Sequence, residues 1–271
     1  MQHLADVRGA DLKGAQMTNA AIEIERLSHV YSGAEGGVPA LQDISMRVAP
    51  GRFVVIVGPS GCGKTSLLMM MAGLRTHSEG RIHVHGAPIA KPDPDRVGVI
   101  FQEASLFPWL TTLDNIEFPL GLRGMSRSDR RARSEPMLSL VGLAGFGARY
   151  PHELSGGMKQ RVSIARGLVQ DPPVLLMDEP FAALDEQTRM TMGHELLRIW
   201  STTQKTVVFI THSLTEAVYL ADEVYVMSAR PGRIIDHIEI DLPRPRTYEM
   251  MATEPFGRLR ERIWQQIRQQ H

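Results

Sequence analysis

Apolar residues gather in short runs along this chain, and four runs lack the polar alternation that an exposed strand face produces. They cover residues 53–57, 97–101, 174–177 and 206–210. Strands that are buried on both faces of a parallel sheet have this pattern. Residues 21–30 and 41–48 instead alternate apolar with polar positions, which is typical of half-exposed antiparallel strands. The pattern predicts an α/β fold with a mixed core sheet and an antiparallel β subdomain.

A helical period replaces the strand pattern in the middle of the chain. It is found over residues 114–122, 126–142 and 158–169. Apolar side chains three or four residues apart line one face of such a helix. We therefore expect an α-helical subdomain, inserted at about residues 103–165. The β pattern returns at residues 223–240, where a turn at residues 230–233 interrupts it.

The end of the chain has one further helical stretch, residues 253–270. Apolar residues recur in it at Phe256, Leu259, Ile263, Trp264 and Ile267. Thr253 is a candidate cap and Pro255 suits the first helical turn. We expect this helix to pack on its own domain and favour that reading over a partner-binding role.

Three regions follow from these patterns. Residues 1–20 mix charged with small residues and contain no apolar core like that of a signal peptide, so they predict a flexible N-terminal tail. Residues 21–245 form the main domain, and residues 246–271 form a C-terminal helical extension. The longest apolar runs are too short to cross a bilayer, so a role at a membrane would require another chain to span it.

Composition narrows the class of protein. The 271 residues are 43% apolar, and 30 basic residues balance 30 acidic ones. The net charge therefore creates no electrostatic field that would favour binding to nucleic acid or to an acidic membrane surface, and we expect no nucleic-acid partner. The single cysteine, Cys62, cannot form an intrachain disulfide and fits a reducing compartment, with the cytoplasm as the default.

A phosphate-binding motif stands between a predicted strand and a predicted helix. Residues 58–65 match G-x-x-x-x-G-K-[ST], and we expect Ser66 to extend the same contact. The motif consists of Gly58, Pro59, Ser60, Gly61, Cys62, Gly63, Lys64 and Thr65. Its backbone N–H groups are suited to bind the α and β phosphates, and Lys64 is suited to reach the β and γ phosphates. The Thr65 hydroxyl is suited to bind Mg²⁺. The expected ligands are therefore ATP and Mg²⁺.

Polar residues follow three of the apolar strands. Asp178 ends one strand, where its carboxylate suits Mg²⁺, and Glu179 beside it is placed to accept a proton from an attacking water. His212 follows another strand at the edge where α/β proteins gather ligand contacts, which makes it a candidate γ-phosphate sensor. Gln102 also follows a strand. It is as consistent with a ligand of Mg²⁺ or water as with a residue that has no role in the site. We expect Glu179, His212, Lys64 and Gln102 to carry the catalysis.

A second anion-binding turn lies at Ser155, Gly156 and Gly157. A glycine-rich turn that opens a helix points free N–H groups and the positive helix end outward. Taken alone, such a turn is common. One chain then has one set of hydrolytic residues but two phosphate-binding turns. A two-fold dimer would use both turns if each chain offered its second turn to the nucleotide of the other chain.

The chain resembles the ATP-binding subunits of the ABC transporter family over residues 22–240. The matching motifs are the loop at 58–65, Gln102, the signature at 154–158, Asp178-Glu179, residues 183–185 and His212. The resemblance implies an ATPase coupled to solute translocation. It also implies that Tyr31 stacks on adenine, that Ser155, Gly156 and Gly157 reach the γ phosphate of the opposite subunit, and that Asp185 helps to join the two sites. Met158 stands where many members have glutamine, at a tolerant position.

Three segments resemble the importer branch for nitrate, sulfonate, taurine and bicarbonate, namely residues 101–110, 178–185 and 226–234. This implies integral-membrane permease subunits as partners and, indirectly, an extracytoplasmic solute-binding protein. It also implies a position on the cytoplasmic face of the bacterial inner membrane. Leu106, Phe107 and Trp109 fit a groove for a coupling helix of the permease, although core packing explains these side chains equally well.

Three other functions compete with transport. A soluble ABC-type ATPase of DNA repair or translation commonly has two cassettes, large insertions or basic patches, and this neutral single cassette has none. A regulatory module without turnover is opposed by the intact Lys64, Asp178, Glu179 and His212. A small-molecule kinase with the same phosphate loop would leave the signature turn unexplained.

Overall fold

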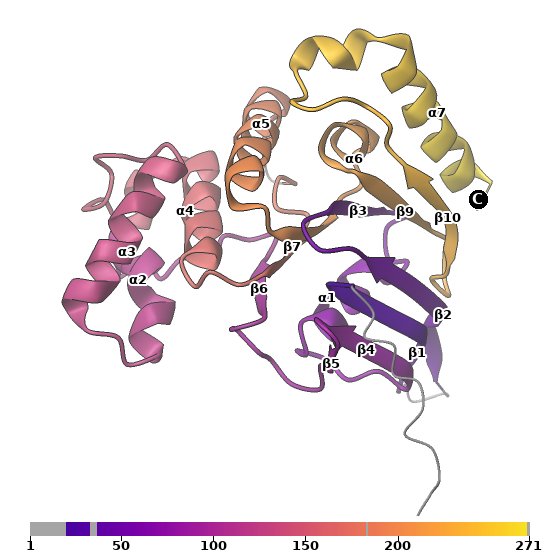
Figure 1. Cartoon of the computed structure of the whole chain (residues 1–271), viewed down its shortest axis with the longest axis horizontal. Coiled ribbons are helices and arrows are strands. Elements are labelled where there is room, and N and C mark those ends of the chain that lie inside the picture. Colours follow the sequence, from indigo (N-terminus) through magenta and orange to yellow (C-terminus); the bar gives the residue numbers. More distant parts are fainter. Residues whose placement is uncertain (1–19, 33–36, 183, 270–271) are drawn as a thin grey trace, which may run out of the picture.

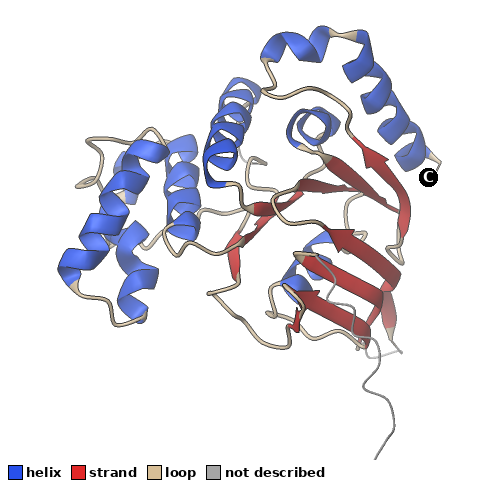
Figure 2. Cartoon of the chain, viewed as in Figure 1, coloured by secondary structure: helices blue, strands red, loops and turns tan. Residues whose placement is uncertain are grey.

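The computed structural model describes residues 20–32, 37–182 and 184–269. The predicted N-terminal tail lies outside these residues except for Ala20. The described part contains two β-sheets, with helices around them (Figures 1 and 2).

The larger sheet has six strands in the order β10-β9-β3-β8-β7-β6. The strands are β3 (Phe53–Val57), β6 (Val97–Ile100), β7 (Val174–Asp178), β8 (Thr206–Ile210), β9 (Glu223–Met227) and β10 (Ile234–Glu239). The first five are parallel, and β10 pairs antiparallel with β9. The apolar runs are therefore buried parallel strands, and the prediction of a mixed core sheet is confirmed.

The smaller sheet is antiparallel and lies beside the larger one, in the order β2-β1-β4-β5. Its strands are β1 (Ile22–Tyr31), β2 (Val38–Val48), β4 (Glu79–Val84) and β5 (Ala87–Pro88). Ile22 and Ile24 are buried whereas Glu25 is exposed, so the alternation read from the sequence marks one buried face. This sheet is the predicted antiparallel β subdomain.

Helix α1 (Lys64–Met71) fills the space between the two sheets. Its Leu67, Leu68, Met70 and Met71 pack in one buried cluster with strands of both sheets. Helices α5 (Glu186–Thr203), α6 (Leu214–Leu220) and α7 (Glu254–Arg268) pack in a second cluster on the opposite face of the larger sheet. Both faces of the core sheet are thus covered, as its continuous apolar strands require.

The helical subdomain projects from one side of the molecule (Figure 1, left). It contains α2 (Thr112–Leu122), α3 (Arg127–Leu140), the short 3₁₀ helix η1 (Pro151–Glu153) and α4 (Gly156–Leu168). Helix α4 begins two residues earlier than its apolar period predicts, because the Ser155 hydroxyl caps it by accepting the N–H of Met158 at 3.3 Å.

The C-terminal extension packs on its own chain. Phe256 and Ile263 of α7 are buried, while Trp264 is 48% exposed. Thr253 is the N-cap residue of α7, as predicted, but its side chain makes no capping hydrogen bond: a second 3₁₀ helix, η2 (Tyr248–Ala252), precedes α7, and the Thr253 hydroxyl donates to the Met250 carbonyl at 2.7 Å. The domain boundaries near residues 20 and 245 stay predictions.

Candidate active site

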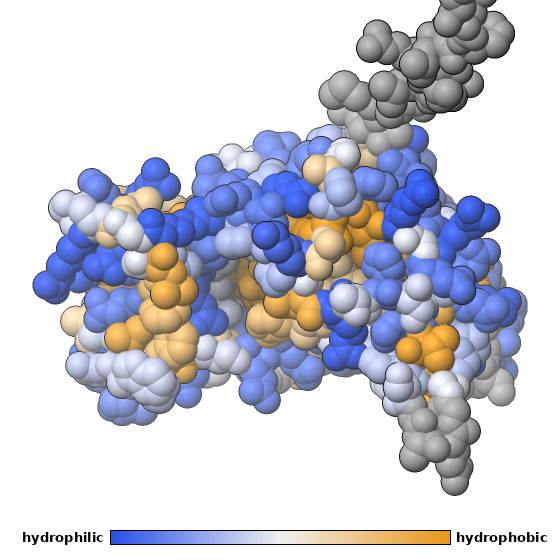
Figure 3. Space-filling model, turned by 90° about the horizontal axis from the view of Figure 1, so that it is seen from below, coloured by the Kyte–Doolittle hydropathy of each residue, from blue (hydrophilic) through white to orange (hydrophobic). Residues whose placement is uncertain are grey.

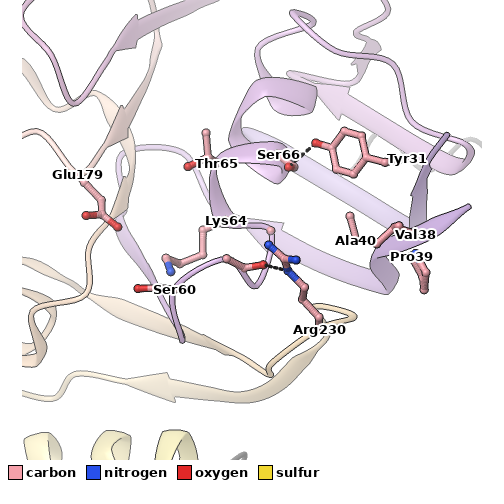
Figure 4. Close-up of a pocket in the computed structure, with 12 residues that line it drawn as sticks. Tyr31, Val38, Pro39, Ala40, Ser60, Lys64, Thr65, Ser66, Glu179 and Arg230 are labelled. Carbon is pink, nitrogen blue, oxygen red and sulfur yellow. Dashed lines mark hydrogen bonds between the residues drawn. The ribbon is translucent and has the colours of Figure 1, made fainter. Parts of the chain in front are cut away.

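A cavity of about 380 Å³ lies where the β3–α1 loop meets the start of β2, the end of β7 and the turn after β9 (Figure 4). Several of the sequence-predicted residues line it. They are Tyr31, Ser60, Gly61, Gly63, Lys64, Thr65, Ser66 and Glu179. Segments that are far apart in the sequence therefore converge on one site.

The loop conformation depends on glycine at two places. Gly63 has φ +103°, and a Cβ there would lie 2.7 Å from Leu41 Cδ2. A Cβ on Gly58 would lie 2.8 Å from the Met227 carbonyl oxygen. Side chains at these positions would push the loop away from β2 and β9, so the spacing of the motif is also a packing requirement.

Lys64 is the buried cation of this loop. Its side chain is only 6% exposed, and Nζ donates to the carbonyl oxygens of Gly58 and Pro59, both at 2.9 Å. These partners are neutral, and the Lys64 charge also opposes the rise that burial causes in the pKa of the nearby Asp178 carboxyl. Such a group suits an anionic ligand such as a phosphate.

Thr65 and Asp178 meet at the end of β7. The Thr65 hydroxyl donates to Asp178 Oδ1 at 3.2 Å, although 113 positions separate the residues. Burial raises the pKa of the Asp178 carboxyl, the neighbouring Glu179 charge raises it further, and the Thr65 bond opposes both. Two oxygen ligands therefore lie side by side, which is the chemistry that Mg²⁺ prefers.

A metal held by protein carboxylates and imidazoles alone does not fit this site. Within the described ranges, no three His, Cys, Asp or Glu side chains form a metal-binding group. Thr65 and Asp178 instead suit Mg²⁺ that shares its remaining ligands with phosphate and water.

Glu179 turns into the cavity directly after β7. Its backbone has φ +44°, and its N–H donates to the Ile210 carbonyl of β8 at 2.9 Å. Its Oε2 lies 2.9 Å from Nδ1 of His212, which follows β8. The two residues, predicted separately from the sequence, form one pair of acid–base groups.

The sequence reading missed the residues that hold the His212 loop. The Thr211 hydroxyl donates to Glu216 Oε2 at 2.5 Å, and Arg189 Nε of α5 lies 3.4 Å from Glu216 Oε1. Arg189 also donates to the Leu184 carbonyl at 3.1 Å. Ser213 caps α6 by accepting the Glu216 N–H, and this Ser-x-x-Glu spacing is the signal that marks Glu216.

Tyr31 lies at the end of β1, on the side of the cavity away from Glu179 (Figure 4). Its hydroxyl is 2.6 Å from Ser66 Oγ and also accepts a hydrogen bond from Arg75. The Arg75 guanidinium lies 5.0 Å from the ring centroid, so a cation covers the ring. An aromatic ring at the rim of a phosphate-binding cavity suits stacking by a nucleobase.

The signature turn and Asp185 lie outside this cavity. Ser155 and Gly156 are exposed, and a Cβ on Gly157 would lie 2.9 Å from Thr188 Cγ2 of α5. Asp185 caps α5 by accepting the N–H of Thr188 at 2.9 Å and its hydroxyl at 2.7 Å, and these bonds lower the pKa of Asp185. Thr188 thus touches both elements, which form a second surface on the same chain.

Gln102 does not reach the cavity either. It is exposed after β6 and does not line the cavity wall, so its role as a ligand of Mg²⁺ or water stays a prediction. Arg230 does line the wall, although the sequence reading treated it only as part of a turn. Its place just after the carboxyl end of β9 is the signal that marks it.

The helical subdomain has an apolar surface of its own, seen at the left of Figure 3. Trp109 is 71% exposed and Leu122 is 76% exposed, and the Phe107 ring contacts the rings of Trp109 and Phe118 in tilted arrangements. Leu106, expected in the same groove, instead packs against the core. In the part of the chain that the structure covers, no helix combines the length and apolarity needed to cross a bilayer.

The chain is similar to several known proteins in sequence and fold. A family model described as ABC transporter matches residues 41–182. A nitrate import ATP-binding protein of Synechocystis sp. (PCC 6803) is 46% identical over 248 residues, 89% of this chain and 93% of its own. A taurine import ATP-binding protein of Pseudomonas putida is 48% identical over 222 residues, 82% of this chain and 84% of its own. A solved dimer of an ATP-binding cassette in a post-hydrolysis state with ADP and phosphate has a TM-score of 0.73 and 30% identity, covering 82% of this chain and all of its own.

Proposed function

The chain belongs to the ABC transporter family as the ATP-hydrolysing subunit of an importer, and on that basis we propose that its cavity is the ATP site and that Glu179 performs the proton transfer. Subunits of this kind bind ATP, form dimers and work with membrane permeases. The observation that carries the site assignment is that the phosphate loop, Thr65 and Glu179 line one cavity, with Asp178 hydrogen-bonded to Thr65 and His212 paired with Glu179.

The cavity has distinct ends for the two ends of ATP. Tyr31 offers its ring to adenine, and the loop N–H groups with Lys64 hold the phosphates. Thr65 and Asp178 suit Mg²⁺, which when bound neutralises phosphate charge and orients the γ phosphate. Gln102 belongs to this assignment only if its loop moves toward the site.

Glu179 and His212 divide the work of hydrolysis. The Glu179 carboxylate accepts a proton from the attacking water, and its positive φ turns it into the cavity. The His212 imidazole, with Nδ1 2.9 Å from Glu179 Oε2, would fix the carboxylate and would serve as a sensor of the γ phosphate when ATP is bound. Each role needs the other residue in place because the contact defines where the proton acceptor points.

The second anion-binding surface serves the other copy of the chain. Ser155, Gly156 and Asp185 are exposed, and none of them lines the chain's own cavity. A head-to-tail homodimer would bring this surface onto the partner's γ phosphate and use it twice by symmetry. The dimeric cassette found with ADP and phosphate supports this arrangement.

The transported solute is a small anion such as nitrate, or a sulfonate such as taurine. Support comes from the names of the two import relatives. We place the protein on the cytoplasmic face of the bacterial inner membrane, bound to permease subunits that receive the solute from an extracytoplasmic binding protein. The exposed Trp109 and Leu122 surface offers the permease an apolar docking site.

The test is purification of the tagged full chain from native membranes, followed by identification of its partner chains. The complex is then placed in vesicles together with the solute-binding protein that it recruits, and ATP hydrolysis is measured with nitrate, taurine or a neutral sugar. We expect integral-membrane partners and stimulation by one of the anions, lost in Glu179→Gln. Recovery with ribosomes or DNA and without membrane partners would reject the transport function.

A further inference from the structure

We infer that Arg230 is a second cation of the nucleotide site and binds the α phosphate. This inference rests on the proposed function, because it concerns the same cavity. Arg230 lines the cavity together with Lys64 and Tyr31. In Figure 4 its guanidinium lies between Tyr31 and the Lys64 ammonium, which is between the expected base and the terminal phosphates.

Arg230 stands on a turn that is tied to the rest of the cavity wall. The Gly232 N–H donates to the Ala40 carbonyl at 2.9 Å, and the Gln42 N–H donates to the Gly232 carbonyl at 2.9 Å. The Ser228 hydroxyl lies 3.0 Å from the Pro231 carbonyl and accepts the Arg233 N–H at 3.0 Å. The turn is therefore hydrogen-bonded to β2, whose first residues also line the cavity.

The same turn is packed against the phosphate loop. A Cβ on Gly232 would lie 2.1 Å from the Cys62 carbonyl oxygen, so only glycine allows this approach. Arg230 Nε donates to the Gly61 carbonyl at 2.6 Å. The arginine is thereby held at the loop by one donor.

The remaining donors of Arg230 are available to a ligand. Its terminal nitrogens make no hydrogen bond to any of the described residues. A guanidinium presents its donors in a planar fork that matches two phosphate oxygens. Lys64 is held at the start of the loop by Gly58 and Pro59, so the two cations serve different phosphates.

Arg233 of the same turn is a matched control. It has the same charge and is exposed, but its Nη2 donates to Gln42 Oε1 at 2.6 Å and it does not line the cavity. The experiment compares Arg230→Met, Arg230→Lys and Arg233→Met with the unmodified chain. Competition against a fluorescent ATP analogue without Mg²⁺ measures dissociation constants for ATP, ADP, AMP and adenosine.

We expect Arg230→Met to weaken the binding of ATP, ADP and AMP by a similar factor, about tenfold or more, since charge-assisted hydrogen bonds are strong. Adenosine binding should not change, and Arg233→Met should bind like the unmodified chain. Arg230→Lys should recover part of the affinity as a point charge. A loss confined to ATP, or an equal loss for adenosine, would overturn the α-phosphate assignment, as would identical behaviour of Arg230→Met and Arg233→Met.

Two controls separate this inference from the proposed function. Melting temperatures show whether each variant is folded, and if Arg230→Met is unfolded the comparison of Arg230→Lys with Arg233→Lys decides the question. The Lys64→Ala variant shows how the nucleotide dissociation constants change when the cation of the phosphate loop is lost. If the unmodified chain fails to bind ATP, the proposed function fails as well. If it binds ATP and Arg230→Met binds ATP, ADP and AMP with the same dissociation constants, the inference alone is wrong.

Discussion

Nδ1 of His212 lies 2.9 Å from Oε2 of Glu179, across 33 positions of sequence. The two residues leave the carboxyl ends of the adjacent strands β7 and β8. Replacing either one therefore changes the surroundings of the other, and their effects on turnover should not be additive.

Glu179→Gln should abolish most ATP turnover and leave ATP binding intact. The amide cannot accept the proton of the attacking water, so we expect phosphate release to fall about 10²–10⁴-fold. Bound ATP would then persist, and analytical ultracentrifugation with ATP should show accumulated dimer. Glu186→Gln, an exposed change in α5, serves as the control. A variant that remains monomeric with ATP would contradict the dimer proposal.

Asp178→Asn should raise the melting temperature of the nucleotide-free protein at neutral pH by a few degrees while abolishing Mg²⁺-dependent hydrolysis. The asparagine oxygen still accepts the Thr65 hydroxyl, but no buried charge remains. Because burial raises the folded pKa of Asp178, its stability contribution is fully present below the ordinary carboxyl pKa and is lost as pH rises through the folded value.

The advantage of Asp178→Asn should therefore shrink as pH falls, which thermal melts from acid to neutral pH will show. Asp241→Asn, an exposed change, is the matched control and should have no pH-dependent advantage. An advantage of Asp178→Asn that is constant over this range would mean that titration of Asp178 is not its cause.

Gly157→Ala should destabilise the chain by about 1–3 kcal/mol, the usual cost of overpacking. Its new Cβ would lie 2.9 Å from Thr188 Cγ2, whereas Gly156 has its nearest such neighbour, Leu184 Cδ2, at 4.0 Å. Denaturant unfolding should show a loss for Gly157→Ala and little change for Gly156→Ala. Adding Thr188→Ser removes the methyl group, keeps the hydroxyl that donates to Asp185, and should restore stability. Failure of this rescue would show that Thr188 is not the obstacle.

Arg189 and Glu216 should act as one unit on turnover. Arg189 joins the Leu184 carbonyl to Glu216, which in turn holds Thr211 beside His212. Arg189→Met and Glu216→Gln should each lower kcat with little effect on the KM for ATP, because both loosen the His212 loop. The double variant should lose less transition-state stabilisation than the sum of the two single losses, with a coupling energy of about 0.5–3 kcal/mol.

Arg198→Met, on the same helix α5, provides the control for that cycle, since Arg198 contacts Glu195 of its own helix and the Leu140 carbonyl of α3. It should leave kcat unchanged. Additive losses for Arg189 and Glu216 would show that the two residues act independently.

The sequence by itself determined the parts of this protein whose causes are local. The loop at residues 58–65, the buried strands and the glycine turn at residues 155–157 that opens a helix were all predicted, because chain conformation and burial pattern follow from neighbouring residues. The motifs that resemble the ABC transporter family were enough to predict an importer ATPase, and the comparisons confirm this prediction. Helix ends shifted by a few residues where a cap such as Ser155 decided them.

Only the tertiary structure decided which of these parts meet. It brought His212 to Glu179 and Arg230 to Gly61, the latter across 169 positions, and it left Gln102 outside the cavity. It also placed Thr188 against Gly157, so that the signature turn and Asp185 share one support. The physical reason is that such contacts depend on how sheets, turns and helices pack against one another, and the periodicity of a single segment carries no information about that packing.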